Sequence, residues 1–202
     1  MTTNPSGDLP SLASQTNAAD LLNIGTALLE EGRVPESILY YRRALELNAE
    51  DEETHFNLGV AHARLGELDQ AARHYREALR IFPDYAEAYN NLGNVLTRQK
   101  RHAEAMEAFQ AALKLSPDNA MAHNNLGRAL AEQGNPAEAL THFAEAARLD
   151  PNYAEARFNV GAAYLTMGRT NEAILEFQAL LQSHPNFAPV IQMLSRLRPT
   201  SR

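Results

Sequence analysis

The sequence predicts an all-α protein built as a solenoid of helical hairpins, and three observations lead to this fold class. Glycines recur at a constant spacing of 34 residues, at Gly25, Gly59, Gly93, Gly127 and Gly161. Small and aromatic residues recur at the same spacing. Alanine, which has the highest helix propensity, occurs 34 times in 202 residues. A period of this length is typical of repeat proteins whose units stack side by side.

The recurring residues have fixed places after each glycine. Twelve residues on is a small residue, at Ser37, Ala71, Ala105, Ala139 and Ala173. Four further on is an aromatic residue, at Tyr41, Tyr75, Phe109, Phe143 and Phe177. The small residues allow two helices to approach closely. We expect the aromatic rings to fill the space between neighbouring hairpins.

Five units of 34 residues follow from this register: 18–51, 52–85, 86–119, 120–153 and 154–187. Each unit holds two stretches with apolar residues at helical spacing, which predicts a hairpin of two helices. The first helix is expected to end at Gly32, Gly66, Gly134 or Gly168, or at Lys100 in the third unit. The second is expected to begin near Pro35 and Pro136 in two units.

The second helix should stop at the closing proline, Pro83, Pro117, Pro151 or Pro185, with Ala49 in its place in the first unit. The next helix should then be capped by Asp84, Asp118, Asn152 or Asn186. Residues 1–17 are expected to form a flexible tail. Residues 188–202 are expected to form a helix that covers the last exposed apolar face, followed by a short tail.

Composition and charge exclude several classes of protein. Cysteine is absent, so disulfide scaffolds and thiolate sites are excluded. The net charge of -7 and the lack of a basic run argue against binding to nucleic acid. No stretch has the length and hydropathy of a membrane span or a signal peptide, so we expect no membrane insertion and a cytoplasmic location.

The repeating pattern resembles the tetratricopeptide repeat (TPR) over residues 18–187. The resemblance implies a right-handed superhelix with a concave groove, lined by the first helix of each hairpin, that binds a protein or peptide partner. The units are also similar to those in the repeat domain of O-linked N-acetylglucosamine transferase, where asparagine ladders bind peptide. The sequence does not indicate the partner, the biological process or the oligomeric state.

An asparagine stands two residues before each recurring glycine, at Asn23, Asn57, Asn91, Asn125 and Asn159. Stacked hairpins would bring these amides into a ladder in the groove. An amide both donates and accepts hydrogen bonds, so such a row can bind an extended peptide backbone. The alternative is that these asparagines serve packing between repeats. The two interpretations have about equal weight from the sequence.

Further polar residues cluster near the ladder and are included in the predicted peptide-binding set: Asn90, Asn94, Asn124, Arg128, Arg64 and Arg98. Arg64 and Arg98 would suit an acidic peptide, although a solvated helix face is the favoured explanation for each of them. Five neutral hydrogen bonds contribute about 2.5–7.5 kcal/mol in total. Ordering a peptide costs about 2–5 kcal/mol, and micromolar binding needs about 8 kcal/mol. The ladder alone therefore cannot give micromolar affinity, and side-chain pockets or avidity must supply the remaining binding free energy.

No enzyme, cofactor or metal site is predicted. The chain lacks G-x-S-x-G, P-loop, G-x-G-x-x-G and H-E-x-x-H motifs. His55 and His123 share one position in the repeat and are expected to pack or to lie beside the groove. The favoured function is an adaptor that binds an extended peptide. The alternatives are a self-associating scaffold that uses its convex face or ends, and an accessory subunit that presents substrates to a glycosyltransferase-like enzyme.

Overall fold

The computed structural model describes residues 17–197, and over that range it contains eleven α-helices and no strand. The chain divides within α5 into two compact units, residues 1–95 and 96–202. The helices of the first unit are α1 (Ala18–Glu30), α2 (Val34–Leu47), α3 (Glu52–Leu65), α4 (Leu68–Ile81) and most of α5 (Ala86–Arg98). Those of the second are α6 (His102–Leu115), α7 (Ala120–Glu132), α8 (Pro136–Leu149), α9 (Ala154–Thr166), α10 (Thr170–Ser183) and α11 (Ala188–Leu197).

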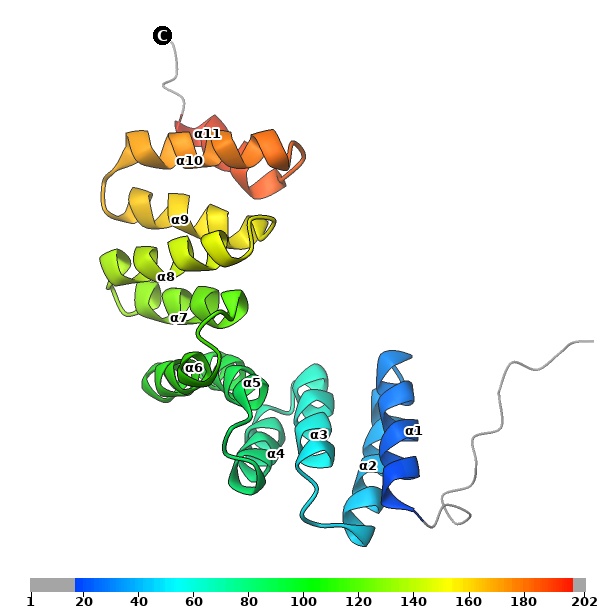
Figure 1. Ribbon diagram of the computed structural model, residues 1–202. Coiled ribbons are helices and arrows are strands. Elements are labelled where there is room, and N and C mark those ends of the chain that lie inside the picture. The colour runs from blue at the N-terminus through cyan, green and yellow to red at the C-terminus, as the bar shows by residue number, and fades with distance from the viewer. Residues whose placement is uncertain (1–16, 198–202) are drawn as a thin grey trace, which may run out of the picture. The chain divides into compact units, whose positions relative to one another are not determined.

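Helices that follow one another in the chain pack together in each unit. In the first unit α2 packs on α1 and α3, and α4 packs on α3. In the second unit the packing runs from α6 through α11 in order, and α7 to α11 form successive layers (Figure 1). The first helices of successive hairpins also contact each other, α1 with α3 and α7 with α9. This confirms the all-α hairpin solenoid within each unit. The right-handed superhelix stays a prediction from the family resemblance.

The turns inside the hairpins have the predicted chemistry. Gly32, Gly66, Gly134 and Gly168 have φ values of 79°, 78°, 82° and 74°, in the left-handed region that glycine tolerates without a steric penalty. Lys100 takes the same conformation, with φ 61°, in the third unit. Pro35 and Pro136 lie at the first or second position of α2 and α8, where the missing N–H costs no hydrogen bond.

Two of the four predicted helix caps, Asp118 and Asn152, were wrong by one residue. The N-cap of α7 is Asn119, whose side chain accepts a hydrogen bond from the backbone N–H of Ala122 at 3.0 Å, so Asp118 lies outside the helix. The N-cap of α9 is Tyr153, so Asn152 does not cap it either. In both places the turn after the proline is one residue longer than the sequence pattern suggested. Asn17 caps α1 and belongs to that helix, whereas residues 1–16 of the expected tail lie outside the described range.

The recurring aromatic ring packs against the glycine of its own hairpin, in addition to the predicted contact with the next hairpin. A β-carbon on Gly127 would lie 2.7 Å from Cε1 of Phe143, and the same contact joins Gly25 to Tyr41 and Gly59 to Tyr75. Tyr41 also belongs to a core cluster with Leu58 of α3, so the ring reaches the next hairpin as well. The glycine and the aromatic residue recur with the same period of 34 because, in each of these hairpins, the ring of the second helix packs on the glycine of the first.

The predicted terminal helix is present as α11, which packs on α10. Val190 is fully buried, in a core cluster with Ala173, Phe177 and Leu180. Met193, Leu194 and Leu197 pack against this cluster while partly exposed. The helix therefore covers the apolar face of α10.

Candidate peptide-binding pocket

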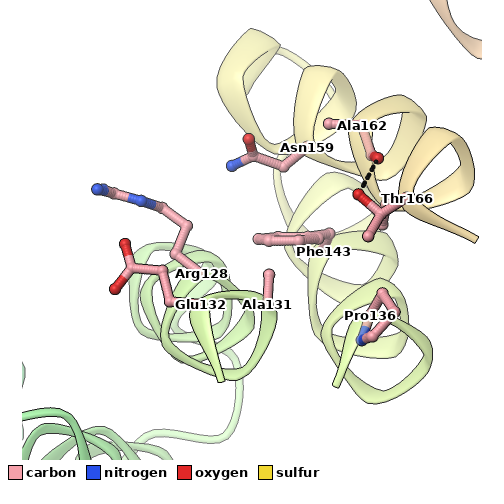
Figure 2. Close-up of a pocket in the computed structure, with 9 residues that line it drawn as sticks. Arg128, Ala131, Glu132, Pro136, Phe143, Asn159, Ala162 and Thr166 are labelled. Carbon is pink, nitrogen blue, oxygen red and sulfur yellow. Dashed lines mark hydrogen bonds between the residues drawn. The ribbon is translucent and has the colours of Figure 1, made fainter. Parts of the chain in front are cut away.

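The second unit contains a pocket between α7, α8 and α9. Its volume is about 190 Å³, and Figure 2 shows the side chains around it. The pocket is lined by Arg128, Ala131, Glu132, Pro136, Phe143, Asn159, Ala162, Ala163 and Thr166. Two of these, Arg128 and Asn159, are residues that the sequence predicted to bind peptide. First helices supply most of the lining, with seven of the nine residues on α7 and α9.

The floor of the pocket is apolar. The ring of Phe143, itself buried, extends from α8 into the space between α7 and α9 (Figure 2). Alanines on α7 and α9 leave room above it, and Pro136 closes one end. Thr166 donates its hydroxyl to the carbonyl of Ala162 at 3.1 Å, so the hydroxyl proton is already satisfied within α9. Such a floor suits an apolar side chain from a ligand.

Asn159 stands at the polar rim and is held by a buried neighbour. Its amide nitrogen donates to Oδ1 of Asn124 at 2.8 Å, and the amide nitrogen of Asn124 donates to the hydroxyl of Tyr153 at 3.1 Å. Burial raises the pKa of Tyr153, so the phenol stays neutral and can accept this bond. Within the described residues Oδ1 of Asn159 has no hydrogen-bond partner. That oxygen can accept a hydrogen bond from a ligand N–H.

Charged groups surround the mouth of the pocket. Arg128 lies 3.8 Å from a carboxylate oxygen of Glu155, and both side chains are about half exposed, at 50% and 52%. Glu132 lies on the same face of α7, one helical turn after Arg128 (Figure 2). An exposed pair at this separation contributes little to stability, so Arg128 can reorient toward a ligand at small cost.

The other predicted ladder residues differ in exposure. In the first unit Asn23 is exposed, and Asn57, Asn91 and Asn94 are half-buried. Within the described residues none of these four side chains makes a hydrogen bond, so their amides are open to a ligand. Asn125 of the second unit is half-buried. A ladder that is continuous over all five hairpins stays a prediction.

Three predicted residues have structural surroundings that the sequence did not reveal. Asn124 is fully buried and Asn90 is 5% exposed, so a peptide in the groove cannot reach their amides directly, and we exclude both from the proposed contact set. Arg64 donates to the backbone carbonyl of Leu29 at 2.6 Å and thereby satisfies the C-terminal end of α1. Arg98 is exposed at the end of α5.

Sequence reasoning missed the floor of the pocket. Phe143 was assigned to packing, and the alanines and Thr166 were not singled out. A signal exists when the fourth and fifth units are aligned at a spacing of 34 residues. Ala162 and Thr166 then take the places of Arg128 and Glu132. Small residues on α9 opposite long side chains on α7 leave the open volume.

The fold and the pocket define this chain as an α-helical repeat protein with a ligand-sized hollow between its first helices. Models of the tetratricopeptide repeat match it at residues 22–86 and 64–120, at 108–141 and at 130–197, and so cover it from residue 22 to residue 197. The chain belongs to the tetratricopeptide repeat family.

Solved structures of TPR proteins are similar in fold. The MamA protein of Desulfovibrio magneticus RS-1 matches with a TM-score of 0.79 and 21% identity, covering 86% of this chain and 98% of that one. YrrB, described as a TPR protein with an unusual peptide-binding site, matches with a TM-score of 0.76 and 21% identity, covering 92% and 98%. TTC0263, a TPR protein of Thermus thermophilus, matches with a TM-score of 0.67 and 24% identity, covering 89% and 98%.

No curated protein sequence matches this chain significantly. Among the described helices, none combines the length and the hydropathy needed to cross a bilayer. No group of three or more histidine, aspartate or glutamate side chains within residues 17–197 is arranged to hold a metal ion.

Proposed function

We propose that this chain is an adaptor that binds an extended segment of a partner protein along its first helices, with the pocket between α7, α8 and α9 as the anchor. The pocket carries the proposal because it can bury an apolar side chain of the ligand, which the asparagine hydrogen bonds cannot do. Burying one leucine-sized side chain contributes about 1.5–3 kcal/mol. Added to the hydrogen bonds of the exposed amides, this brings micromolar binding within reach.

The chemistry of the pocket defines the preferred ligand. A volume of about 190 Å³ accommodates a side chain of the size of leucine, isoleucine, methionine or phenylalanine. Oδ1 of Asn159 would accept a backbone N–H of the ligand beside the buried side chain. YrrB, which has a similar fold, is described as having a peptide-binding site, and this supports a peptide as the ligand class.

Selection of peptides from a random display library tests the proposal. The native chain is the bait, and Ala162→Leu, which fills the pocket, is the counter-bait. Ala144→Leu is the matched control, because it makes the same exchange at an exposed position on α8 outside the pocket. We expect enriched peptides with one medium-sized apolar residue that bind native chain and control alike and the counter-bait at least tenfold more weakly. Equal binding to all three baits would exclude the pocket as the anchor.

A second candidate function is self-association, favoured by apolar side chains exposed on second helices and at the C-terminal end. Leu39 of α2 is 52% exposed, Leu175 of α10 is 65% exposed and Ile191 of α11 is 48% exposed. Sedimentation velocity over a hundredfold range of concentration would detect a dimer, and Leu175→Arg should abolish it. The role as an accessory subunit of a glycosyltransferase-like enzyme stays a hypothesis without a supporting contact in either unit.

A further inference from the structure

Two hairpins hold their helices together with a pair of histidines in the same geometry. In the first unit Nδ1 of His55 on α3 lies 3.1 Å from Nδ1 of His74 on α4. In the second unit Nδ1 of His123 on α7 lies 3.0 Å from Nδ1 of His142 on α8. The ring centroids are 5.4 Å and 5.3 Å apart, with interplanar angles of 33° and 32°. We call these the two histidine pairs.

The surroundings assign a tautomer to each ring. Nε2 of His55 lies 3.3 Å from the carbonyl of Ala49, and Nε2 of His123 lies 3.0 Å from the carbonyl of Pro117. A carbonyl only accepts, so these Nε2 atoms carry the proton and their Nδ1 atoms present a lone pair. His74 and His142 must therefore donate from Nδ1. Each pair needs one proton between its two Nδ1 atoms.

Of the charged and titratable groups that face the pairs, all oppose a second proton except the carboxylates of Glu77, Glu138 and Glu145. His74 is surrounded by His55 and His62 on α3, Arg42 on α2 and Arg73 on its own helix. Glu77, which lies near both histidines of this pair, is engaged by Arg80. His142 faces His123 and, on α8, Glu138, while Glu145 near His123 is engaged by Arg148. His55 and His123 lie in the first turn or second turn of their helices, where the helix dipole disfavours a cation.

We infer that each histidine pair is a proton-sensitive latch, which holds hairpins α3–α4 and α7–α8 closed with one shared proton and releases them when a second proton binds. A proton on Nδ1 of His55 or His123 leaves two N–H groups facing each other, so the hydrogen bond is lost and one ring becomes positive about 3 Å from its partner. The opening is local to these hairpins, because α1–α2 and α9–α10 have no such pair among the described residues.

Burial and the neighbouring histidines lower the pKa of His74 to about 4, and burial and His123 lower the pKa of His142. Because the folded-state pKa lies below the ordinary value of about 6.5, the unfolded chain binds the proton more tightly. The stabilising contribution of each pair is therefore complete above about pH 6.5 and decreases as the pH falls toward the folded-state pKa.

The latch of the second unit controls the candidate pocket. His142 precedes Phe143, whose ring forms the pocket floor, and His123 lies on α7 before Arg128. Separation of α7 from α8 would move the floor away from the α7 side of the rim. Acidification should then release a bound peptide. This consequence rests on the proposed function, whereas the latch itself does not.

Nitrogen NMR of the full chain with ¹⁵N-labelled histidine tests the latch directly. At pH 7.5 we expect a scalar coupling between the two Nδ1 atoms of each pair, with His55 and His123 protonated at Nε2. Four histidines that titrate independently, with no coupling across the pairs, would overturn the inference. The measurement uses the native protein, so a variant that fails to fold cannot obscure it.

Amide hydrogen exchange gives the second readout. Between pH 6.5 and 5 the protection factors of α3–α4 and α7–α8 should fall by up to about tenfold per pH unit relative to α1–α2 and α9–α10. The double variant His55→Gln, His123→Gln keeps an acceptor for the Nδ1–H of His74 and His142 but lacks the ring nitrogen that takes the second proton, so it should reduce this difference. His184→Gln, outside both pairs, should retain it. A uniform loss in all hairpins would overturn the latch. If the histidine results hold but a selected peptide stays bound at pH 5, the latch stands but does not control the pocket. The proposed function itself fails only if Ala162→Leu leaves peptide binding unchanged.

Discussion

The ring of Phe177 lies so close to the backbone of Gly161 that a β-carbon on the glycine would come within 2.3 Å of ring atom Cε1. Similar distances of 2.6 Å to 2.7 Å occur at Gly25, Gly59 and Gly127. The glycine and the aromatic residue are thus one packing unit, in which the absence of a side chain on the first helix makes room for a ring from the second. This unit explains why both residues recur with the same period.

Gly161→Ala should destabilise the chain, although alanine is the better helix former. The gain in helix propensity is about 1 kcal/mol, while overpacking against a buried ring costs about 1–3 kcal/mol. We expect a net loss of about 1 kcal/mol in the free energy of unfolding by urea. The double variant Gly161→Ala, Phe177→Leu should show a favourable coupling, because the shortened side chain relieves the clash. A more stable Gly161→Ala would contradict the crossing geometry.

Lys100→Gly should stabilise the chain. Lys100 has φ 61°, which costs a residue with a β-carbon about 1–2 kcal/mol that glycine avoids. We expect the free energy of unfolding, measured in urea, to increase by about 1 kcal/mol. Gly66→Lys is the matched reverse exchange at the same position of another hairpin, with φ 78°, and it should lose a similar amount. Changes of the same sign in both variants would rule out the conformational explanation.

Asn124 and Asn159 should be coupled in stability. Asn124→Ala leaves the partly buried hydroxyl of Tyr153 and the amide of Asn159 without their partner, which costs about 1–3 kcal/mol. A double-mutant cycle with Asn159→Ala should give a coupling of about 1 kcal/mol. Additive effects would mean that the hydrogen bond between them adds nothing, and that Asn159 is available entirely to a ligand.

Much of the fold was predictable, because the residues that define the hairpins act locally. The left-handed turn at Gly66 and the first-turn position of Pro136 follow from backbone sterics, which depend on single residues. The caps were less predictable, since the turn after Pro117 uses one more residue than the pattern implies and so moves the N-cap to Asn119.

The site was only partly predictable. Asn159 and Arg128 were identified because they recur or carry charge, and both line the pocket. The burial of Asn124 was not foreseen, because its hydrogen-bond partner Tyr153 lies 29 residues away, at the N-cap of α9. The pocket floor depends on which side chains are absent between α7 and α9, and no single residue type marks such a space.

Amide chemical-shift mapping of a peptide selected on the native chain tests the central claim most directly. The account predicts the largest shifts on α7 and α9, including the side-chain amide of Asn159, with intermolecular NOEs between the apolar side chain of the peptide and Phe143. These NOEs should be lost in Ala162→Leu and retained in Ala144→Leu. Shifts confined to the exposed faces of α8 and α10, with no NOE to Phe143, would contradict the proposal that this pocket binds the partner.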